Sequence, residues 1–199
     1  FSSSFQILES AAMQSITAAL FFLGMPAICN AANMGFSRRF FLEAYPHIYP
    51  GMVSGDDVFL LHEAKKSKGG GTGYSCPEAS MVTTGIESGL IGILKQRIRW
   101  GGKARFYRDP SAVILTLLVF TGNLASLWAL LHLFLDKSWQ GAITGMLSGK
   151  VLIEFVLIFS HLQKCKQKRF LAFFPLMAAI YPLYITFTGI ITFFAKPGR

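Results

Sequence analysis

Three long apolar runs in the second half of the chain restrict the folds that are open to it. Residues 112–135 contain no Asp, Glu, Lys or Arg and are long enough to cross ~30 Å of hydrocarbon. Residues 142–160 and 170–194 form two further apolar runs. Because lipid offers the backbone no hydrogen-bond partners, each run is predicted to form a membrane-spanning helix.

The second and third runs contain side chains that membrane helices usually avoid. Lys150 and Glu154 are four residues apart and therefore share one helix face, where we expect them to pair or to face other helices. Pro175 and Pro182 are expected to kink the third helix. The ion pair also leaves open a non-catalytic function, as a membrane transporter or scaffold subunit in which this pair is the functional element.

The basic residues gather beside the apolar runs. The formal net charge is +9, and Lys and Arg are concentrated at residues 97–108 and 164–169. This placement favours contact with anionic membrane lipids over nucleic acid, because the chain has no basic face with interleaved aromatic residues. By the positive-inside rule, we expect a multi-pass protein of the cell (plasma) membrane with residues 1–108 in the cytosol and the C-terminus outside.

Residues 1–108 have the mixed pattern of a globular domain, and residues 109–199 form the membrane region. Segments 27–34 and 74–84 have the pattern of short strands, so the first part is predicted to be of class α/β. Helices are expected at residues 4–22, stopped by Gly24 and Pro26, at 37–42, started by Ser37, at 56–64, and at 87–107 with a break at Gly101-Gly102. On the last of these, Lys95, Arg99 and Lys103 follow one another at four-residue intervals and are expected to share one face. The three cysteines, which have no motif spacing and are expected to be buried free thiols, are Cys29, Cys76 and Cys165.

An acidic pair, Asp56 and Asp57, follows a loop rich in Pro and Gly and opens an apolar helix. A carboxylate at the mouth of a cleft can accept a proton from an attacking hydroxyl, which makes Asp57 a candidate general base. The adjacent Asp56 would raise the proton affinity of Asp57 through like-charge repulsion, or bond to the backbone instead. The alternative interpretation is simple capping, since acidic residues are favoured at the start of a helix.

A basic and aromatic cluster lies about forty residues later, at Gln96-Arg97-Ile98-Arg99-Trp100. Arginine binds phosphate through two parallel hydrogen bonds and stays charged, so Arg97 and Arg99 are candidate diphosphate ligands. The flat apolar ring of Trp100 can stack on a sugar. Alternatively, this segment is an interfacial helix whose Arg and Trp side chains anchor it at the level of the lipid headgroups.

The acidic pair, the segment Gln96–Trp100 and the apolar runs together resemble the membrane-embedded family-2 glycosyltransferases, the synthases of the cellulose, chitin, hyaluronan and poly-N-acetylglucosamine type. Ala32-Asn33-Met34 is similar to the Gly-Ala-Asn turn near the acceptor site of that family, although Ala32 stands where Gly is usual. Residues 73–79 are similar to the strand segment between the two motifs. The resemblance covers about residues 25–110, and the apolar runs match in kind only.

The resemblance implies an inverting transferase that moves a sugar from a nucleotide-sugar donor to the hydroxyl of a glycan or lipid acceptor. Asp57 would be the general base, with Asp56 beside it. The substrate-binding residues would be Asn33, Gln96, Arg97, Arg99 and Trp100. The implied fold is α/β plus transmembrane α: the acceptor-side half of a GT-A domain within residues 1–108, followed by three transmembrane helices in residues 109–199.

The resemblance also implies a divalent metal, Mg or Mn, on the diphosphate. That metal is normally held by an Asp-x-Asp motif in the upstream half of a GT-A domain, and this chain contains no Asp-x-Asp. We therefore expect the metal ligands and the donor pocket to lie upstream of Phe1, and the chain to be inactive by itself. A homo-oligomer or an accessory subunit is a further expected partner.

Overall fold

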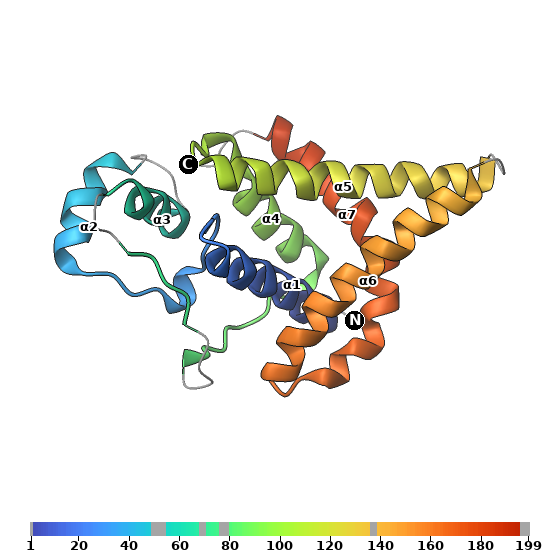
Figure 1. Cartoon of the computed structure of the whole chain (residues 1–199), viewed down its shortest axis with the longest axis horizontal. Coiled ribbons are helices and arrows are strands. Elements are labelled where there is room, and N and C mark those ends of the chain that lie inside the picture. The colour runs from blue at the N-terminus through green and yellow to red at the C-terminus, as the bar shows by residue number, and fades with distance from the viewer. Residues whose placement is uncertain (1, 49–54, 68–70, 76–79, 136–138, 196–199) are drawn as a thin grey trace. The chain divides into compact units, whose positions relative to one another are not determined.

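The computed structural model describes residues 2–48, 55–67, 71–75, 80–135 and 139–195. Within these ranges the chain forms helices joined by irregular segments, and no strand occurs (Figure 1). The elements in chain order are α1 (Ser2–Phe22), η1 (Ala31–Asn33), α2 (Arg38–Ala44), η2 (Tyr45–His47), α3 (Asp56–Lys66), α4 (Gly89–Gly102), η4 (Ala104–Phe106), α5 (Pro110–Leu135), α6 (Gln140–Lys164), η5 (Lys168–Phe173) and α7 (Phe174–Phe194).

The strands predicted at 27–34 and 74–84 are wrong wherever the structure describes these residues. The first segment forms the 3₁₀ turn η1, because the Asn30 side chain accepts a hydrogen bond from the Ala32 N–H and so caps the turn. The second segment has no regular strand at 74–75 or 80–84. A strand needs a neighbour to satisfy its backbone, and the described residues provide none. They therefore show no α/β domain of the GT-A kind.

The predicted helices are confirmed, and local chemistry sets their ends. α1 stops at Phe22, just before Gly24, whose φ of +70° is unfavourable for residues with a side chain. Ser37 caps α2 by accepting a hydrogen bond from the Phe40 N–H, 3.2 Å away. α3 begins directly after Gly55, and α4 ends at the pair of glycines predicted to break it.

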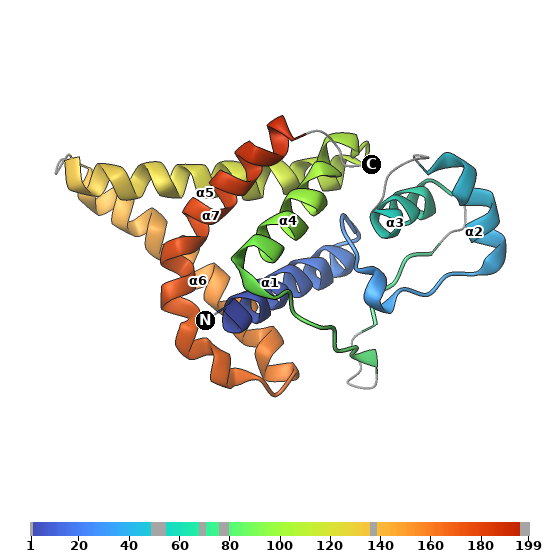
Figure 2. The ribbon, with the colours of Figure 1, turned by 180° about the vertical axis from the view of Figure 1, so that it is seen from behind.

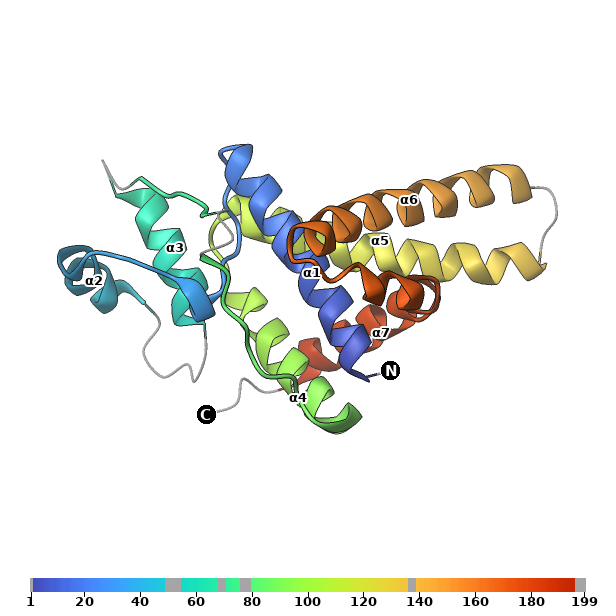
Figure 3. The ribbon, with the colours of Figure 1, turned by 90° about the horizontal axis from the view of Figure 1, so that it is seen from below.

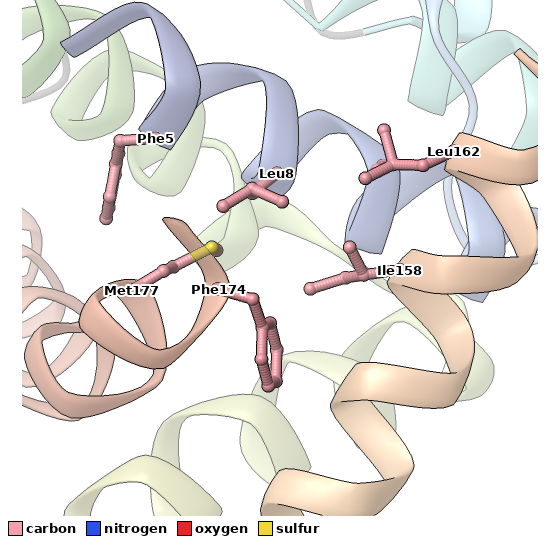
Figure 4. Close-up of a cluster of buried hydrophobic side chains, with 7 residues drawn as sticks. Phe5, Leu8, Ile158, Leu162, Phe174 and Met177 are labelled. Atoms are coloured by element: carbon pink, nitrogen blue, oxygen red, sulfur yellow. The ribbon is translucent and has the colours of Figure 1, made fainter. Parts of the chain in front are cut away.

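The chain folds as two compact units. The first unit comprises Phe1–Ile16 and Leu117–Ile190, and the second comprises Thr17–Thr116 and Ile191–Arg199. The core of the first unit is formed by side chains from α1, α6 and α7 that point toward one another (Figure 4). Its buried members are Phe5, Leu8, Ala11, Ile158, Leu162, Phe174 and Met177. Within the same unit, Gly189 gives the Phe120 ring room to approach α7, because an added Cβ would lie 2.6 Å from that ring.

Three helical segments are long and apolar enough to cross a membrane, as the sequence predicts: Pro110–Leu133, Gln140–Lys164 and Lys168–Phe194. Most of their side chains are not covered by the rest of the chain. α5 and α6 run in opposite directions (Figure 3). The predicted ion pair is confirmed, with Lys150 Nζ 2.5 Å from Glu154 Oε1. Pro175 lies in the first turn of α7, where a missing N–H is harmless, whereas Pro182 lies inside the helix.

The end of α7 lies against the segment that precedes α5. Arg105 donates hydrogen bonds to the carbonyls of Phe193 and Ala195 at 3.1 and 3.0 Å, and to that of Thr192. A Cβ added at Gly101 would lie 3.0 Å from the Thr192 side chain. These contacts hold the end of α7 beside the residues that precede α5.

The second unit has its own core between α2 and α3, which pack against each other (Figure 2). The buried members of this core are Ala44, Ile48, Phe59 and Leu60. The partly buried side chains that pack around them are Met34, Phe40, Phe41, Phe106 and Tyr107. This core fixes α3, and with it the first turn that carries Asp56 and Asp57.

One lysine joins three parts of the second unit. Lys65, near the end of α3, donates to the Pro26 carbonyl at 2.8 Å and to Ser111 Oγ at 3.2 Å. Its Nζ also lies 2.6 Å from Asp109 Oδ2, and both side chains are largely buried. Lys65 therefore links the segment after α1, the helix α3 and the first turn of α5.

Candidate functional site

The two aspartates of the acidic pair have different surroundings. Asp57 Oδ1 accepts a hydrogen bond from the Val58 N–H at 2.9 Å, and Oδ2 accepts one from the Ala31 N–H at 3.2 Å. The Asp57 side chain is only 16% exposed, whereas Asp56 is an exposed residue. Asp57 is therefore held in one orientation against η1, and Asp56 lies toward solvent.

The turn that Asp57 contacts carries another predicted site residue, Asn33. The Asn33 side chain donates a hydrogen bond to the Ser80 carbonyl, which fixes the end of η1. The structure thus brings together Asp57 and the Ala32-Asn33 turn, which are more than twenty residues apart in sequence.

Sequence reasoning placed Lys103 on the cationic face of α4 but not in the site. Lys103 Nζ lies 3.8 Å from Asp57 Oδ1, and the Lys103 side chain is 10% exposed. Gly55 makes room for this approach, because an added Cβ would lie 2.9 Å from Lys103 Cδ and 3.0 Å from the Phe59 ring. The signal in the sequence was the four-residue spacing that puts Lys103 one helical turn after Arg99.

Cys29 and Tyr107 lie close enough to Asp57 for its charge to act on them. The pKa of the Cys29 thiol is raised to about 12, chiefly by burial and also by the Asp57 charge, while the Lys103 charge acts to lower it. Burial likewise raises the Tyr107 pKa, with smaller contributions from Asp57 and Cys29. Both groups therefore stay protonated and neutral at physiological pH, so Cys29 does not act as a nucleophile.

The cysteine predictions are partly tested. Cys29 and Cys165 are half-buried and form no disulfide within the described residues, and Cys76 lies outside these residues.

The predicted cluster on α4 is held together by its own contacts. Gln96 donates to Glu87 Oε1 at 3.3 Å, and Arg97 donates to Gln96 Oε1. The Arg97 guanidinium lies 4.3 Å from the centre of the Trp100 ring and covers one of its faces. Arg97 is therefore a support for Gln96 and Trp100, whereas the exposed Arg99 presents its guanidinium to solvent.

Asp57 and the α4 cluster are connected through Lys103, which follows Trp100 by three residues and faces Asp57. Two of the hollows in the described part of the chain lie beside α3 near the start of α5 and on α2, and neither is lined by Asp57, Gln96 or Trp100. The structure thus brings Asp57 to Lys103 and to the turn that carries Asn33.

A metal does not fit the residues that the structure describes. Among them, no three His, Cys, Asp or Glu side chains are grouped closely enough to hold an ion. No step of the proposed chemistry below is therefore assigned to a metal.

Comparison with family models, with curated proteins and with solved structures finds no match for this chain. The functional assignment consequently depends on its own motifs and on the contacts they make.

Proposed function

We propose that this chain supplies the acceptor side of a membrane-bound inverting glycosyltransferase, a hexosyltransferase of polysaccharide or glycolipid synthesis. The observation that carries the proposal is the contact between Asp57 and η1, the turn that includes Asn33. A general base must be oriented before it can be effective, and two backbone N–H groups orient the Asp57 carboxylate.

In the proposed reaction, the acceptor hydroxyl donates a hydrogen bond to Asp57. Asp57 takes the proton while the hydroxyl oxygen attacks the anomeric carbon of the donor sugar. The bond from that carbon to the nucleoside diphosphate breaks on the opposite face, which inverts the configuration. Each Asp57 oxygen accepts only one backbone hydrogen bond, so lone pairs remain for the acceptor.

The α4 cluster supplies the complementary groups in this proposal. Arg99 binds the departing diphosphate, since its guanidinium is exposed. Trp100 stacks on a sugar ring with the face that Arg97 leaves uncovered, and Gln96 holds Arg97 in place. The basic residues before α5 favour the cytosolic face, where nucleotide sugars are found.

The test is sugar transfer by washed membranes from cells that express the complete gene. Radiolabelled UDP-glucose, UDP-N-acetylglucosamine, UDP-glucuronate and GDP-mannose are supplied in turn with Mg²⁺ or Mn²⁺, and label in polymer and lipid fractions is counted. We expect Asp57→Asn to lower transfer about 10²–10⁴-fold, because it removes a general base. Membrane insertion and protein amount should not change.

The matched control is Glu43→Gln, which neutralises an exposed carboxylate on α2 far from Asp57 in sequence. It should transfer sugar at the wild-type rate. Wild-type transfer by Asp57→Asn, with every donor, would contradict the proposal.

The same assay separates this proposal from a non-catalytic membrane protein built on Lys150 and Glu154. Under that alternative, replacing both residues by Ala should be the most damaging change. Under the glycosyltransferase proposal, Trp100→Ala should weaken use of the acceptor far more than it lowers thermal stability. A loss of stability with unchanged acceptor affinity would instead favour a role of Trp100 as an interfacial anchor.

A further inference from the structure

The turn that joins α6 to η5, within the first unit, gathers basic side chains at one end of two membrane-length segments. Lys164 is the last residue of the segment Gln140–Lys164, and Lys168 is the first residue of Lys168–Phe194. Arg169 follows directly, and all three basic residues are exposed. Because the end of a membrane-length helix lies at the border between hydrocarbon and water, these cations lie at the depth of lipid headgroups in a bilayer.

Backbone hydrogen bonds close this turn tightly. The Gln167 N–H donates to the Leu162 carbonyl at 2.8 Å, and the Lys166 N–H donates to the Gln163 carbonyl at 3.2 Å. Lys166 has a φ of +57°, the left-handed conformation with which many helices end. Leu162 is buried in the core of the first unit (Figure 4). The turn is therefore anchored in the packed part of that unit, and it holds the cations on its two sides near each other.

Two of the three cations lie against aromatic rings. Lys168 Nζ is 5.4 Å from the centre of the Phe159 ring, and Arg169 Cζ is 5.0 Å from the centre of the Phe170 ring. The face of an aromatic ring attracts a cation but carries no net charge, so both groups keep their full positive charge. These contacts restrict the two side chains, which reduces the entropy that is lost when they bind an anion.

No carboxylate pairs with Lys164, Lys168 or Arg169 among the residues that the structure describes. The sequence contains no Asp or Glu after Glu154, and Glu154 pairs with a lysine of its own helix at 2.5 Å. α1 packs against this end of the unit, but its Glu9 is only 2% exposed. The turn therefore presents three positive charges to its surroundings.

We propose that this turn binds phospholipids with a net negative charge from the membrane leaflet beside it. Arg169 holds two phosphate oxygens through parallel hydrogen bonds, and the two lysines contribute point charges. The acyl chains lie along exposed apolar side chains of the two adjoining helices, such as Val156 on α6 and Leu176 on α7. This apolar surface, which continues from the turn along both helices, favours a lipid over an acidic protein segment.

Fluorescence quenching beside the turn tests this proposal. In a cysteine-free full-length protein, the exposed Gln163→Cys is labelled with a neutral fluorophore, and the protein is reconstituted in phosphatidylcholine bilayers. A small, equal amount of phosphatidylglycerol or phosphatidylcholine with a nitroxide on its acyl chain is then added. We expect phosphatidylglycerol to be enriched about fivefold beside the label, the gain expected from one favourable cation–headgroup contact. Equal quenching by the two lipids would overturn the proposal.

Charge-neutralising variants locate the contact. Lys168→Gln combined with Arg169→Gln should remove most of the preference for phosphatidylglycerol, and Lys164→Gln should remove part of it. The matched control, Arg38→Gln combined with Arg39→Gln, neutralises two adjacent exposed cations on α2, in the other unit, and should leave the preference unchanged. An equal loss in the two double variants would mean unspecific charge attraction and would overturn the proposal.

A charge-conserving exchange separates binding from packing against the rings. Lys168→Arg combined with Arg169→Lys keeps both charges and should keep the preference. If this exchange abolishes the preference as completely as the neutral double variant does, the two residues act through packing and the proposal is wrong.

Salt and free phosphate separate a lipid headgroup from a small anion. Sodium chloride at about 0.5 M should weaken the preference, because exposed charges are screened, and sodium phosphate at the same ionic strength should weaken it no further. A much stronger loss in phosphate would make the turn a small-anion site and would contradict the proposal. The turn contains none of the residues assigned to sugar transfer, so this result is independent of that assignment.

Discussion

The Arg105 guanidinium donates a hydrogen bond to the Phe193 carbonyl, 3.1 Å away, and so joins the segment before α5 to the last turn of α7. Arg105 donates a second hydrogen bond to the Ala195 carbonyl, 3.0 Å away. A cation at the carboxyl end of a helix satisfies carbonyls that have no partner within the helix. The contact holds the end of α7 beside the residues that precede α5.

This contact predicts an even number of membrane crossings by α5, α6 and α7. In a cysteine-free background, Ala195→Cys and the exposed Lys95→Cys should react with an impermeant maleimide from the same side of sealed vesicles. Trp139→Cys, at the start of α6, should react from the other side. If Ala195→Cys and Trp139→Cys react from the same side, and Lys95→Cys from the other, the result would indicate three complete crossings.

Gly55 is predicted to be intolerant of any side chain. Its φ is +121°, and an added Cβ would lie 2.9 Å from Lys103 and 3.0 Å from Phe59. Gly55→Ala should lower the free energy of unfolding by about 1–3 kcal/mol, measured by chemical denaturation in detergent. Gly35→Ala is the control, because a Cβ there meets nothing within 4 Å and φ is not positive. An equal effect at both positions would contradict the close approach of Lys103 to Gly55.

Acidification should destabilise the second unit in two stages. Burial lowers the folded-state pKa of His62 below 6.5, so the unfolded chain binds its proton first and stability falls as the pH drops from about 6.5 toward the folded value. Burial alone would raise the pKa of Asp109, but Lys65 and the Ala112 N–H hold it below 3.8. The contribution of the ionised Asp109 side chain to stability is therefore lost only as the pH falls below 3.8.

Thermal unfolding followed across this pH range separates the two groups. His62→Gln cannot titrate and should remove the loss near neutral pH while keeping the loss at low pH. A variant whose melting temperature falls from pH 7 to pH 5 as steeply as that of the wild type would show that another group titrates there.

Gly189, in the first unit, is predicted to tolerate no side chain, because the Phe120 ring packs against it. A Cβ there would lie 2.6 Å from the Phe120 ring, so Gly189→Ala should destabilise the unit by about 1–3 kcal/mol through overpacking. Phe120→Leu should relieve most of that loss when the two changes are combined. Gly122→Ala on α5 has open space and should be neutral or slightly stabilising. The free energies of unfolding for this double-mutant cycle are measured by steric trapping or with denaturant. Additive effects of Gly189→Ala and Phe120→Leu would show that the two residues are not in contact.

Local patterns predicted the helices well because their ends depend on neighbouring residues. Ser37, Gly24 and the acidic first turn of α3 mark boundaries that the structure confirms. The strand at 27–34 was mispredicted because a run of small and apolar residues has the composition of a strand. There the Asn30 cap stabilises a turn instead, and no neighbouring strand competes with it among the described residues.

Two candidate regions that were named from the sequence, Asp57 and the turn that carries Asn33, lie in contact. Lys103 was missed as a site residue because nothing local indicates that it reaches across 46 positions to Asp57. The three membrane-length helices were predictable because hydropathy gives the length of a span, whereas nothing local to Arg105 indicates its contact with the end of α7.

The three bonds of Lys65 have a mechanical consequence. Helices adjust their tilt when bilayer thickness changes. The first turn of α5 is tied through Asp109 and Ser111 to Lys65, and Lys65 belongs to the same rigid helix whose opposite end carries Asp57. We therefore expect a displacement of the first turn of α5 to be transmitted to α3, and the orientation of the Asp57 carboxylate to respond to the thickness of a surrounding membrane.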